Sequence, residues 1–444
     1  MLKQIADTKN INDLDFLTEI FRSGCKTGEK TGIEFEKIGV YSDSLKAVRY
    51  PDIARFLQTF KNGNWSGVYE GNNIIGLKNE TGTISLEPGS QLEISLNPLD
   101  TIAEIENKIT EYNKITARIA EKMGIIWLGY GIQPLSTNKN IKIIPKKRYE
   151  YMTRYLPTIA KKPLVMMRET SGIQTGIDYK SEQDAMQKLS LALKLSPIIS
   201  AAFANSPVRG GKLTGYKSYR AFSWLHTDNE RCGLVSSKLF ERDFEFSFED
   251  YAKILLNVPM IFIERKGIGA IPVKNLTFSQ FLKDGYEGFT AQIEDWELHL
   301  SLYFPDVRLK SYLEIRNHDN QRPELIPAVP AFWKGLLYSK NASNEALELL
   351  KPFSYIDFEY IRRKTPKCGL SMNIKGYNLA QIATEALKIS YSALKKAGIG
   401  EEKYLEPLLE LTKEGKTPAD VIIDRWNGTW DKDLQKLIEY STLR

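Results

Sequence analysis

The sequence predicts an α+β protein built on a largely antiparallel sheet. Three stretches, at 32–40, 85–96 and 311–316, alternate apolar and polar side chains, and stretches with helical periodicity lie between them. Successive side chains of a strand point to opposite faces of a sheet, so each of these strands has one apolar and one polar face. The polar face must look into water or into a cleft.

The polar faces of all three strands carry carboxylates. The polar positions are Glu34 and Glu36 in the first strand, and Glu314 and Arg316 in the last. In the middle stretch, SLEPGSQLEISL, Glu93 lies on the polar side of the alternating half. Glu87 precedes this half. Pro88–Gly89, which lies between Glu87 and the alternating half, is expected to bend or bulge the backbone.

Helical periodicity and end signals predict the remaining elements. The predicted helices are 11–24, Pro51 to Phe60, 101–123, 182–195 and 378–397, and the chain is expected to be mostly helical from Ala331. A buried strand is predicted at IIWLGYGIQP (125–134) and an alternating segment at 165–179. Ser181 with Asp184 can cap the fourth helix, and FANSP (203–207) is expected to end the helical region beyond Pro197.

Composition predicts an ordinary soluble protein. The 444 residues are 42% hydrophobic and 26% charged, and the net charge of +6 is modest for this length, well below that of a dedicated nucleic-acid binder. The three cysteines have no paired spacing, which favours a reducing compartment. No signal peptide or run of roughly 20 apolar residues is recognisable. We therefore expect a cytoplasmic monomer or homodimer, with residues 1–444 as one composite unit and neither nucleic acid nor membrane as a partner.

A cluster of carboxylates would favour a metal-bearing cleft. Any single Glu–x–Glu pair is most simply a solvated face, but carboxylates within ~4–6 Å of each other raise each other's pKa unless cations occupy the cluster. Mg²⁺ is the natural occupant, and it is usually held together with substrate phosphates. The chain has neither a GxxxxGK[ST] loop nor a GxGxxG motif after a strand. The residues alone therefore predict only a metal-bearing cleft, with a nucleotide as one possible ligand.

Other candidate sites are weaker. His226, His299 and His318 lack the spacing of a zinc site and are expected to be hydrogen-bonded or on the surface. The basic stretch from Lys139 to Lys162, with interleaved tyrosines, could bind nucleic acid, attract ATP or acidic substrates, or be a solvated face.

Seven blocks of the sequence together resemble the plant-type glutamate–cysteine ligases, from about residue 24 to residue 430. They are IEFEK, IIGLK, SLEPGSQLEIS, FANSP, the RxxxW of Arg220 to Trp224, FPDVRLKSYLEIR and PAFWKGLLY. The resemblance implies a curved, glutamine-synthetase-like antiparallel sheet that forms a bowl, with helices outside and a helical C-terminal third. It also implies ATP-dependent joining of the γ-carboxylate of L-glutamate to the amine of L-cysteine, through γ-glutamyl phosphate, as the first step of glutathione or related thiol synthesis.

The resemblance also implies roles for individual residues. Arg220 is expected to grip the glutamate carboxylate, Trp224 to wall that site and Gln174 to lie on the same floor. Arg316 is expected to offset phosphate charge, and we assign catalysis to Arg316 and Glu93. The residues expected to hold Mg²⁺ or Mn²⁺ are Glu34, Glu36, Glu87, Glu93 and Glu314.

The chain departs from the family pattern near the predicted site. Gln174–Thr175–Gly176 stands where relatives usually have QVN, and Phe35 replaces a polar residue between the two glutamates. The Gly176 departure keeps one alternative open, a ligase of the same fold that uses a different amine. The basic stretch from Lys139 to Lys162 keeps a second open, a non-catalytic basic nucleic-acid-binding protein. The positions aligned with the redox cysteines of the plant enzymes are Glu106, Val273 and Pro327, so that switch is expected to be absent.

Overall fold

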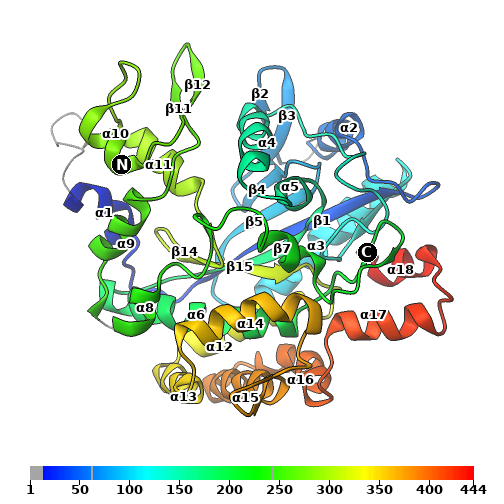
Figure 1. The fold of residues 1–444 in the computed structure, drawn as a ribbon. Coiled ribbons are helices and arrows are strands. Elements are labelled where there is room, and N and C mark those ends of the chain that lie inside the picture. Colours follow the sequence, from blue (N-terminus) through cyan, green and yellow to red (C-terminus); the bar gives the residue numbers. More distant parts are fainter. Residues whose placement is uncertain (1–13, 62–63, 243–244) are drawn as a thin grey trace.

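A mainly antiparallel sheet of nine strands runs through the centre of the molecule (Figure 1). The computed structural model describes residues 14–61, 64–242 and 245–444. The strand order is β14-β15-β7-β1-β5-β4-β3-β2, and β6 pairs with the far end of β1. The strands are β1 Thr31–Tyr41, β2 Ser66–Glu70, β3 Asn73–Lys78, β4 Gly82–Leu86, β5 Leu92–Leu99, β6 Ile125–Leu128, β7 Gly172–Ile177, β14 Val307–Leu309 and β15 Leu313–Asp319. The α+β class and the antiparallel sheet are thus confirmed.

The two faces of the sheet differ as the alternation predicts. Ile33 and Phe35 of β1 are buried in the main apolar core, together with Ile94 of β5 and Ile315 of β15. The helices that pack behind the sheet are α2 Tyr50–Phe60, α3 Ile102–Glu121, α6 Glu182–Ala202 and α12 Ala328–Leu337. The opposite, polar face is therefore left to form a cleft.

Strand β15 contains a bulge that changes which side chains face the cleft. Its pairing with β7 runs regularly through Ile315, which lies opposite Thr175, and resumes at His318, which lies opposite Ile173. One extra residue of β15 lies in this interval, so the alternation shifts by one position. As a result His318 packs against Phe203 and Trp333 on the core side.

Two groups of elements rise on either side of the polar face (Figure 1). The first contains α1 Leu14–Arg22, α8 Ser237–Arg242, α9 Phe248–Leu256, α10 Phe278–Asp284, α11 Ile293–Ser301 and the hairpin of β11 Phe262–Arg265 and β12 Gly269–Pro272. The second contains β2 to β4 with α4 Lys147–Ile159 and α5 Pro163–Glu169. The groups touch where Tyr151 of α4 packs on Phe262, with ring centroids 5.4 Å apart.

The C-terminal third is mostly helical, as predicted, and packs below the sheet in Figure 1. Its helices after α12 are α13 Lys340–Leu350, α14 Tyr355–Cys368, α15 Leu379–Ala397, η3 Glu402–Leu405, α16 Glu406–Lys413, α17 Pro418–Asn427 and α18 Leu434–Ser441, with the short pair β16 Asn373–Ile374 and β17 Tyr377–Asn378. The remaining short elements are β8 Val208–Arg209, β9 Lys212–Leu213, α7 Tyr219–Trp224, β10 Cys232–Gly233 and β13 Phe304–Pro305. Among the described residues, none of the helices combines the length and apolar composition that crossing a membrane requires.

Three sequence predictions about elements need correction. Residues 165–169, predicted to alternate as a strand, belong to helix α5, because Pro163 occupies the helix start that proline favours. The buried strand predicted at 125–134 ends at Leu128, where Gly129 brings the backbone close to Gln321: a Cβ there would lie 2.1 Å from the Gln321 carbonyl oxygen. The helix predicted at 11–24 ends at Arg22; the structure describes it from Leu14, and residues 11–13 lie outside the described residues.

Helix α6, predicted over 182–195, continues through Pro197 to Ala202, and FANSP follows directly, as predicted. Proline removes the N–H that would bond the carbonyl four residues earlier, which belongs to Leu193. The Ser196 hydroxyl donates a hydrogen bond to that carbonyl at 3.1 Å. The predicted Ser181 cap is confirmed, since its side chain accepts from the Asp184 N–H.

Candidate active site

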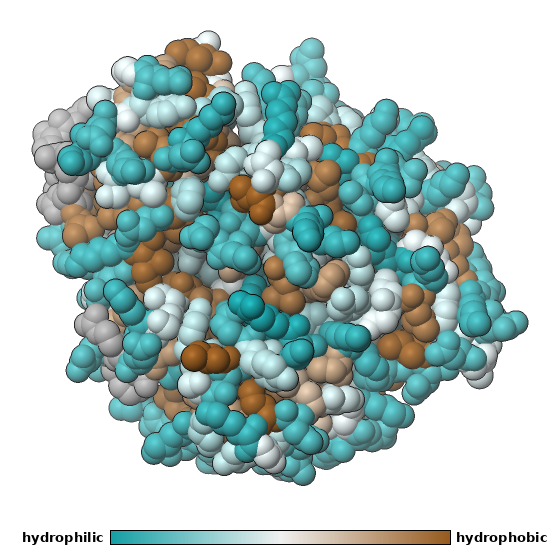
Figure 2. Space-filling model, in the orientation of Figure 1, coloured by the Kyte–Doolittle hydropathy of each residue, from teal (hydrophilic) through white to brown (hydrophobic). Residues whose placement is uncertain are grey.

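The carboxylates of the polar face line one cavity of about 1090 Å³. The strand registers bring them together, because Glu36 pairs with Glu93 across β1 and β5, and Glu34 pairs with Gln174 across β1 and β7. In the space-filling view, hydrophilic side chains surround a hollow near the middle of this face (Figure 2). The site residues predicted from the sequence that line this cavity are Glu34, Glu36, Glu87, Glu93, Gln174, Arg220, Trp224, Glu314 and Arg316.

Glu36 and Glu93 form the buried centre of the cluster. The Gly172 N–H donates to Glu36 Oε2 at 2.7 Å, and the Ser85 hydroxyl donates to Glu93 Oε1 at 2.9 Å. Burial, followed by the charge of Glu87, raises the pKa of Glu36 to about 8. Burial and the neighbouring glutamates raise the pKa of Glu93 well above its usual range. Without a cation, therefore, the pair is unfavourable in its charged form.

Glu34 and Glu87 complete the acidic wall. Burial and then the charge of Glu314 raise the pKa of Glu34. Glu87 stands at the turn before β5, where its carbonyl accepts from the Ser90 N–H at 2.9 Å. The bend expected at Pro88–Gly89 is present, and Gly89 is required there because a Cβ would lie 2.1 Å from the Arg168 carbonyl oxygen. This turn points Glu87 at the same cavity as Glu93.

Glu314 differs from the other glutamates because cations surround it. Oε2 accepts from Arg308 Nε at 2.8 Å and Arg316 Nη1 at 2.6 Å, and Oε1 accepts from Lys310 Nζ at 2.8 Å. Burial alone would raise the pKa of Glu314, but these three cations hold it well below its usual range. Both oxygens are already engaged, and the metal-binding role expected of Glu314 stays a prediction.

Arg316 connects the strands at the floor of the cavity. Besides Glu314, its Nη1 donates to Gln174 Oε1 of β7 at 2.8 Å. The negative charge of Glu314 outweighs the effect of burial and raises the pKa of Arg316 above its ordinary value. Arg316 is thus a permanently charged group held between two strands.

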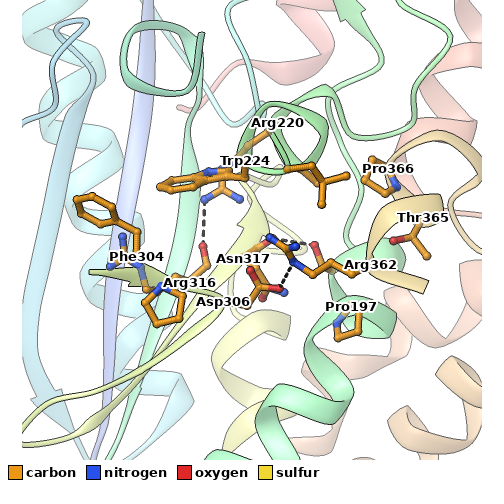
Figure 3. Close-up of a pocket in the computed structure, with 14 residues that line it drawn as sticks. Pro197, Arg220, Trp224, Phe304, Asp306, Arg316, Asn317, Arg362, Thr365 and Pro366 are labelled. Atoms are coloured by element: carbon orange, nitrogen blue, oxygen red, sulfur yellow. Dashed lines mark hydrogen bonds and ion pairs between the residues drawn. The ribbon is translucent and has the colours of Figure 1, made fainter. Parts of the chain in front are cut away.

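Arg220, on helix α7, points its guanidinium toward β15 (Figure 3). Its Nη2 donates to the Arg316 carbonyl at 3.0 Å, and the side chain is 4% exposed. Among the described residues, Nε and Nη1 have no hydrogen-bond partner. The approach depends on Gly172, where a Cβ would lie 2.4 Å from Arg220 Nη2. A buried guanidinium with free donors is suited to a carboxylate ligand.

Trp224 lies one turn after Arg220 on α7 and forms a wall beside it. Its ring centroid is 6.2 Å from that of Phe304, and both rings line the main cavity. They also line a side chamber of about 500 Å³ that extends toward Asp306 and Arg362 of α14 (Figure 3). The aromatic pair therefore separates the carboxylate cavity from this chamber.

A second large cavity, of about 710 Å³, adjoins the first on the same face of the sheet. Glu34, Gln174 and Glu314 line both cavities. Its floor is open where Gly32 and Gly176 lie side by side in β1 and β7, and Tyr312 stands against Gly176, 3.3 Å from where a Cβ would be. Two substrates placed in the two cavities would meet at the shared residues.

The structure changes the interpretation of the two sequence departures. Phe35 is fully buried in the apolar core, on the face opposite Glu34 and Glu36, so its side chain does not line the site. Gly176 lines the second cavity and does not line the cavity that contains Arg220.

Sequence reasoning assigned no individual role to four cations that line the main cavity: Lys146, Arg148, Arg308 and Lys310. Arg308 and Lys310 belong to the FPDVRLKSYLEIR block, and the pairing of Arg308 with Glu314 across β14 and β15 was the available signal. Arg148 comes from the basic stretch Lys139–Lys162, and it bonds Ser301 of α11 through Oγ at 3.0 Å and through the carbonyl at 2.7 Å. Part of that stretch therefore lines the cleft.

The remaining candidates are structural. His299 and His318 are buried and hydrogen-bonded, to the Leu255 carbonyl and the Trp333 indole respectively, and His226 is exposed. These positions agree with the sequence prediction. Cys25, Cys232 and Cys368 are free thiols.

The donor set at the acidic wall fits a hard divalent cation. Glu34, Glu36, Glu87 and Glu93 offer only oxygens, which Mg²⁺ and Mn²⁺ prefer. The pKa values of Glu34, Glu36 and Glu93 are raised, so a bound cation would stabilise their charged forms. Among the described residues, no group of three or more His, Cys, Asp or Glu side chains already stands in a metal-binding arrangement. A cation would have to draw these carboxylates together.

Comparisons with known proteins agree with this site. The family model described as glutamate–cysteine ligase family 2 matches residues 30–440. The chloroplastic glutamate–cysteine ligase of Medicago truncatula is 36% identical over 95% of this chain and 84% of its own, and that of Arabidopsis thaliana is 37% identical over 94% and 80%.

Solved structures share the fold at low sequence identity. A glutamate–cysteine ligase from Francisella tularensis in complex with AMP has a TM-score of 0.51 at 14% identity, covering 93% of this chain and 89% of its own. A bifunctional glutathione synthetase from Pasteurella multocida has a TM-score of 0.55 at 13% identity, covering 96% of this chain and 53% of its own.

The plant relatives also correct one prediction. They are chloroplastic proteins, so the cytoplasmic location expected from the sequence is wrong. The extent of the family match and the identity to the plant enzymes leave one conclusion: the chain belongs to glutamate–cysteine ligase family 2.

Proposed function

We propose that the protein is an ATP-dependent glutamate–cysteine ligase that acts in glutathione synthesis. The observation that carries the proposal is the meeting of two cavities at Glu34, Gln174 and Glu314, with Arg316 at the junction. A ligase of this kind must bring a nucleotide phosphate against an amino-acid carboxylate, and two adjoining cavities with a charged boundary suit that task.

The reaction has two steps. An oxygen of the glutamate γ-carboxylate attacks the γ-phosphorus of ATP, and the bond to the β-phosphate oxygen breaks, releasing ADP. The cysteine amine then attacks the γ-carbonyl carbon, loses a proton, and the carbon–oxygen bond to phosphate breaks. The products are γ-glutamylcysteine, ADP and phosphate.

Glutamate is assigned to the main cavity. The free Nε and Nη1 of Arg220 would receive its α-carboxylate in a planar fork, and Trp224 would exclude water from that side. Gln174 would lie on the floor below, its amide held by Arg316. In this placement the γ-carboxylate points toward the acidic wall.

ATP is assigned to the second cavity. The paired glycines Gly32 and Gly176 leave a flat floor for the nucleotide, and Lys26 and Lys30 at its edge are suited to phosphate charge. The γ-phosphate would then lie at the shared residues, near Arg316. There Arg316 would stabilise the charge that spreads over the phosphate oxygens during transfer.

Glu34, Glu36, Glu87 and Glu93 would hold Mg²⁺ or Mn²⁺, and Glu314 would join them only if a cation displaced one of its present partners. When bound, the metal supplies neutralisation of phosphate and carboxylate charge. The polar face of the sheet would then be the floor of a bowl-shaped site, with residues 1–444 acting as one unit and no nucleic acid or membrane required.

Phosphate release tests the proposal. The protein is incubated with ATP, Mg²⁺ and glutamate, and phosphate and ADP are measured with L-cysteine and with a panel of other amines at equal concentration. Phosphate release that depends on glutamate and is fastest with cysteine is the expected result. Faster release with another amine would establish the alternative ligase, and no glutamate-dependent release with any amine would overturn the assignment.

A further inference from the structure

The carboxylate of Asp319 lies behind the site, at the end of the strand that carries Glu314 and Arg316. Its side chain is 1% exposed and touches none of the cavities described above. It accepts three hydrogen bonds: the Asn205 N–H at 2.8 Å, the Ser206 hydroxyl at 2.6 Å and the Ser218 hydroxyl at 2.8 Å. The three donors satisfy the buried Asp319 carboxylate. Because it lines no cavity, it does not contact the substrates in the proposed reaction.

Both serines that bond Asp319 hold the start of helix α7. The Ser218 hydroxyl caps the helix by accepting from the Ala221 N–H at 2.9 Å. The Ser206 hydroxyl accepts from the Arg220 N–H at 3.2 Å. Each hydroxyl therefore donates to Asp319 and accepts from α7, so the carboxylate fixes the direction of both hydroxyls.

Arg220 is consequently attached to β15 at two points. Its backbone is held through Ser206 by Asp319, and its guanidinium donates to the Arg316 carbonyl three residues earlier on the same strand. The chain leaves room for this arrangement at Gly131, where a Cβ would lie 2.8 Å from Asp319 Cγ. The contact places the helix that carries Arg220 and Trp224 in a fixed register with the strand that carries Arg316.

We propose that Asp319 is a positioning residue for glutamate binding, which it serves by holding Arg220 through Ser206 and Ser218. The proposal rests on the role assigned to Arg220 under the proposed function. Loss of Asp319 should weaken the binding of glutamate and leave the binding of ATP unchanged, because the second cavity has no contact with α7.

The experiment measures the KM for glutamate and for ATP in Asp319→Asn and Ser206→Ala, with Ser206→Thr as the conservative variant that keeps the hydroxyl. Glu401→Gln is the matched control. Glu401 is also a buried carboxylate at a helix start: it accepts from the Ile102 N–H of α3 at 2.7 Å and from Lys334 Nζ, and it lines none of the three cavities described above. We expect the first two variants to raise the KM for glutamate roughly fivefold to tenfold, as for a lost charge-assisted hydrogen bond, and Ser206→Thr and Glu401→Gln to leave it unchanged.

A double-variant cycle with Arg220→Ala separates positioning from general destabilisation. If Asp319 acts through Arg220, Asp319→Asn has no further effect on the KM for glutamate once Arg220 is alanine. An equal effect in both backgrounds, or an equal rise in the KM for ATP, would overturn the positioning role. If Arg220→Ala itself leaves the KM for glutamate unchanged, the role assigned to Arg220 fails first and this proposal fails with it. If Asp319→Asn does not fold, Ser206→Ala in the same cycle gives the same decision.

Discussion

Glu36 and Glu93 are directly paired across the neighbouring strands β1 and β5, with both side chains facing the same cavity. This register places two carboxylates on adjacent positions of one face, and Arg220 and Arg316 offset the charge of Glu36 only in part. Burial and the neighbouring negative charges make both carboxylates harder to ionise, so the pKa values of Glu36 and Glu93 are raised. We therefore expect the site to depend on an added cation.

Replacing Glu93 by glutamine should lower kcat by at least about a hundredfold, because a neutral amide is a poor ligand for a divalent cation. The fold should persist, since the change relieves like-charge repulsion. The measurements are steady-state turnover and thermal unfolding with and without Mg²⁺, in which the wild-type protein should gain stability from Mg²⁺ and the variant should gain less. The exposed Glu345 on α13 provides a control, Glu345→Gln. Normal turnover in Glu93→Gln would contradict the metal assignment.

Arg220→Lys should raise the KM for glutamate by roughly tenfold to a hundredfold with a smaller change in kcat. An ammonium keeps the charge but cannot present two parallel N–H donors to a carboxylate. Initial rates against glutamate concentration at saturating ATP measure the effect. An unaltered KM would mean that the carboxylate binds elsewhere.

Arg316→Gln should act mainly on kcat, which we expect to fall by about 10² to 10³, as for the loss of one group that stabilises transition-state charge. Glutamine can still donate to Gln174, so the floor of the cavity should remain in place. Single-turnover formation of ADP isolates the phosphoryl-transfer step. A rise in KM without a fall in this rate would mean that Arg316 acts in substrate binding and not in phosphoryl transfer.

Gly172→Ala should disturb glutamate binding although residue 172 carries no functional group. The added methyl would stand 2.4 Å from Arg220 Nη2 and 2.9 Å from the His318 carbonyl oxygen, so the guanidinium must move. The expected result is a higher KM for glutamate, with the KM for ATP preserved. Gly215→Ala is not a suitable comparison because its φ is +80°, whereas Gly28→Ala is, since its nearest neighbour would be 4.0 Å away.

Acid should destabilise the protein through its buried histidines. Burial lowers the pKa of His299 to about 4, so below its ordinary value of about 6.5 the unfolded chain binds a proton that the folded chain does not. Stability is then full above that value and falls with decreasing pH, by about 1.4 kcal/mol per pH unit for this one group. The free energy of unfolding, measured with urea between pH 7 and pH 5, should fall less steeply with decreasing pH for His299→Gln than for the wild type. Equal slopes would show that His299 titrates normally.

The strand faces could be predicted because they depend on a local rule. The period of two places Glu34 and Glu36 opposite Phe35 whatever the partner strands are, and the same holds for Glu314 against Ile315. Capping is equally local, as Ser181 shows.

What could not be predicted depends on contacts between distant segments. The order β15-β7-β1-β5 decides that Gln174 meets Arg316, and no local pattern encodes it. The neutralisation of Glu314 by Arg308 and Lys310 follows from a hairpin register. Pro197 remained inside α6 because a neighbouring hydroxyl satisfies the carbonyl that the proline leaves free. The location of Gly176 in the second cavity likewise required the folded sheet.

The bulge between Ile315 and His318 has a consequence for how this enzyme can vary. Pairing the same residues without the bulge would turn the imidazole of His318 toward the substrates and the carboxylate of Asp319 into the hydrocarbon interior, whereas deleting one residue between Ile315 and His318 would leave both side chains on their present faces. The bulge therefore decides which side chains after Arg316 face the core, and it keeps Asp319 on the side of Ser206 and Ser218. A chain that lost the extra residue would keep that arrangement.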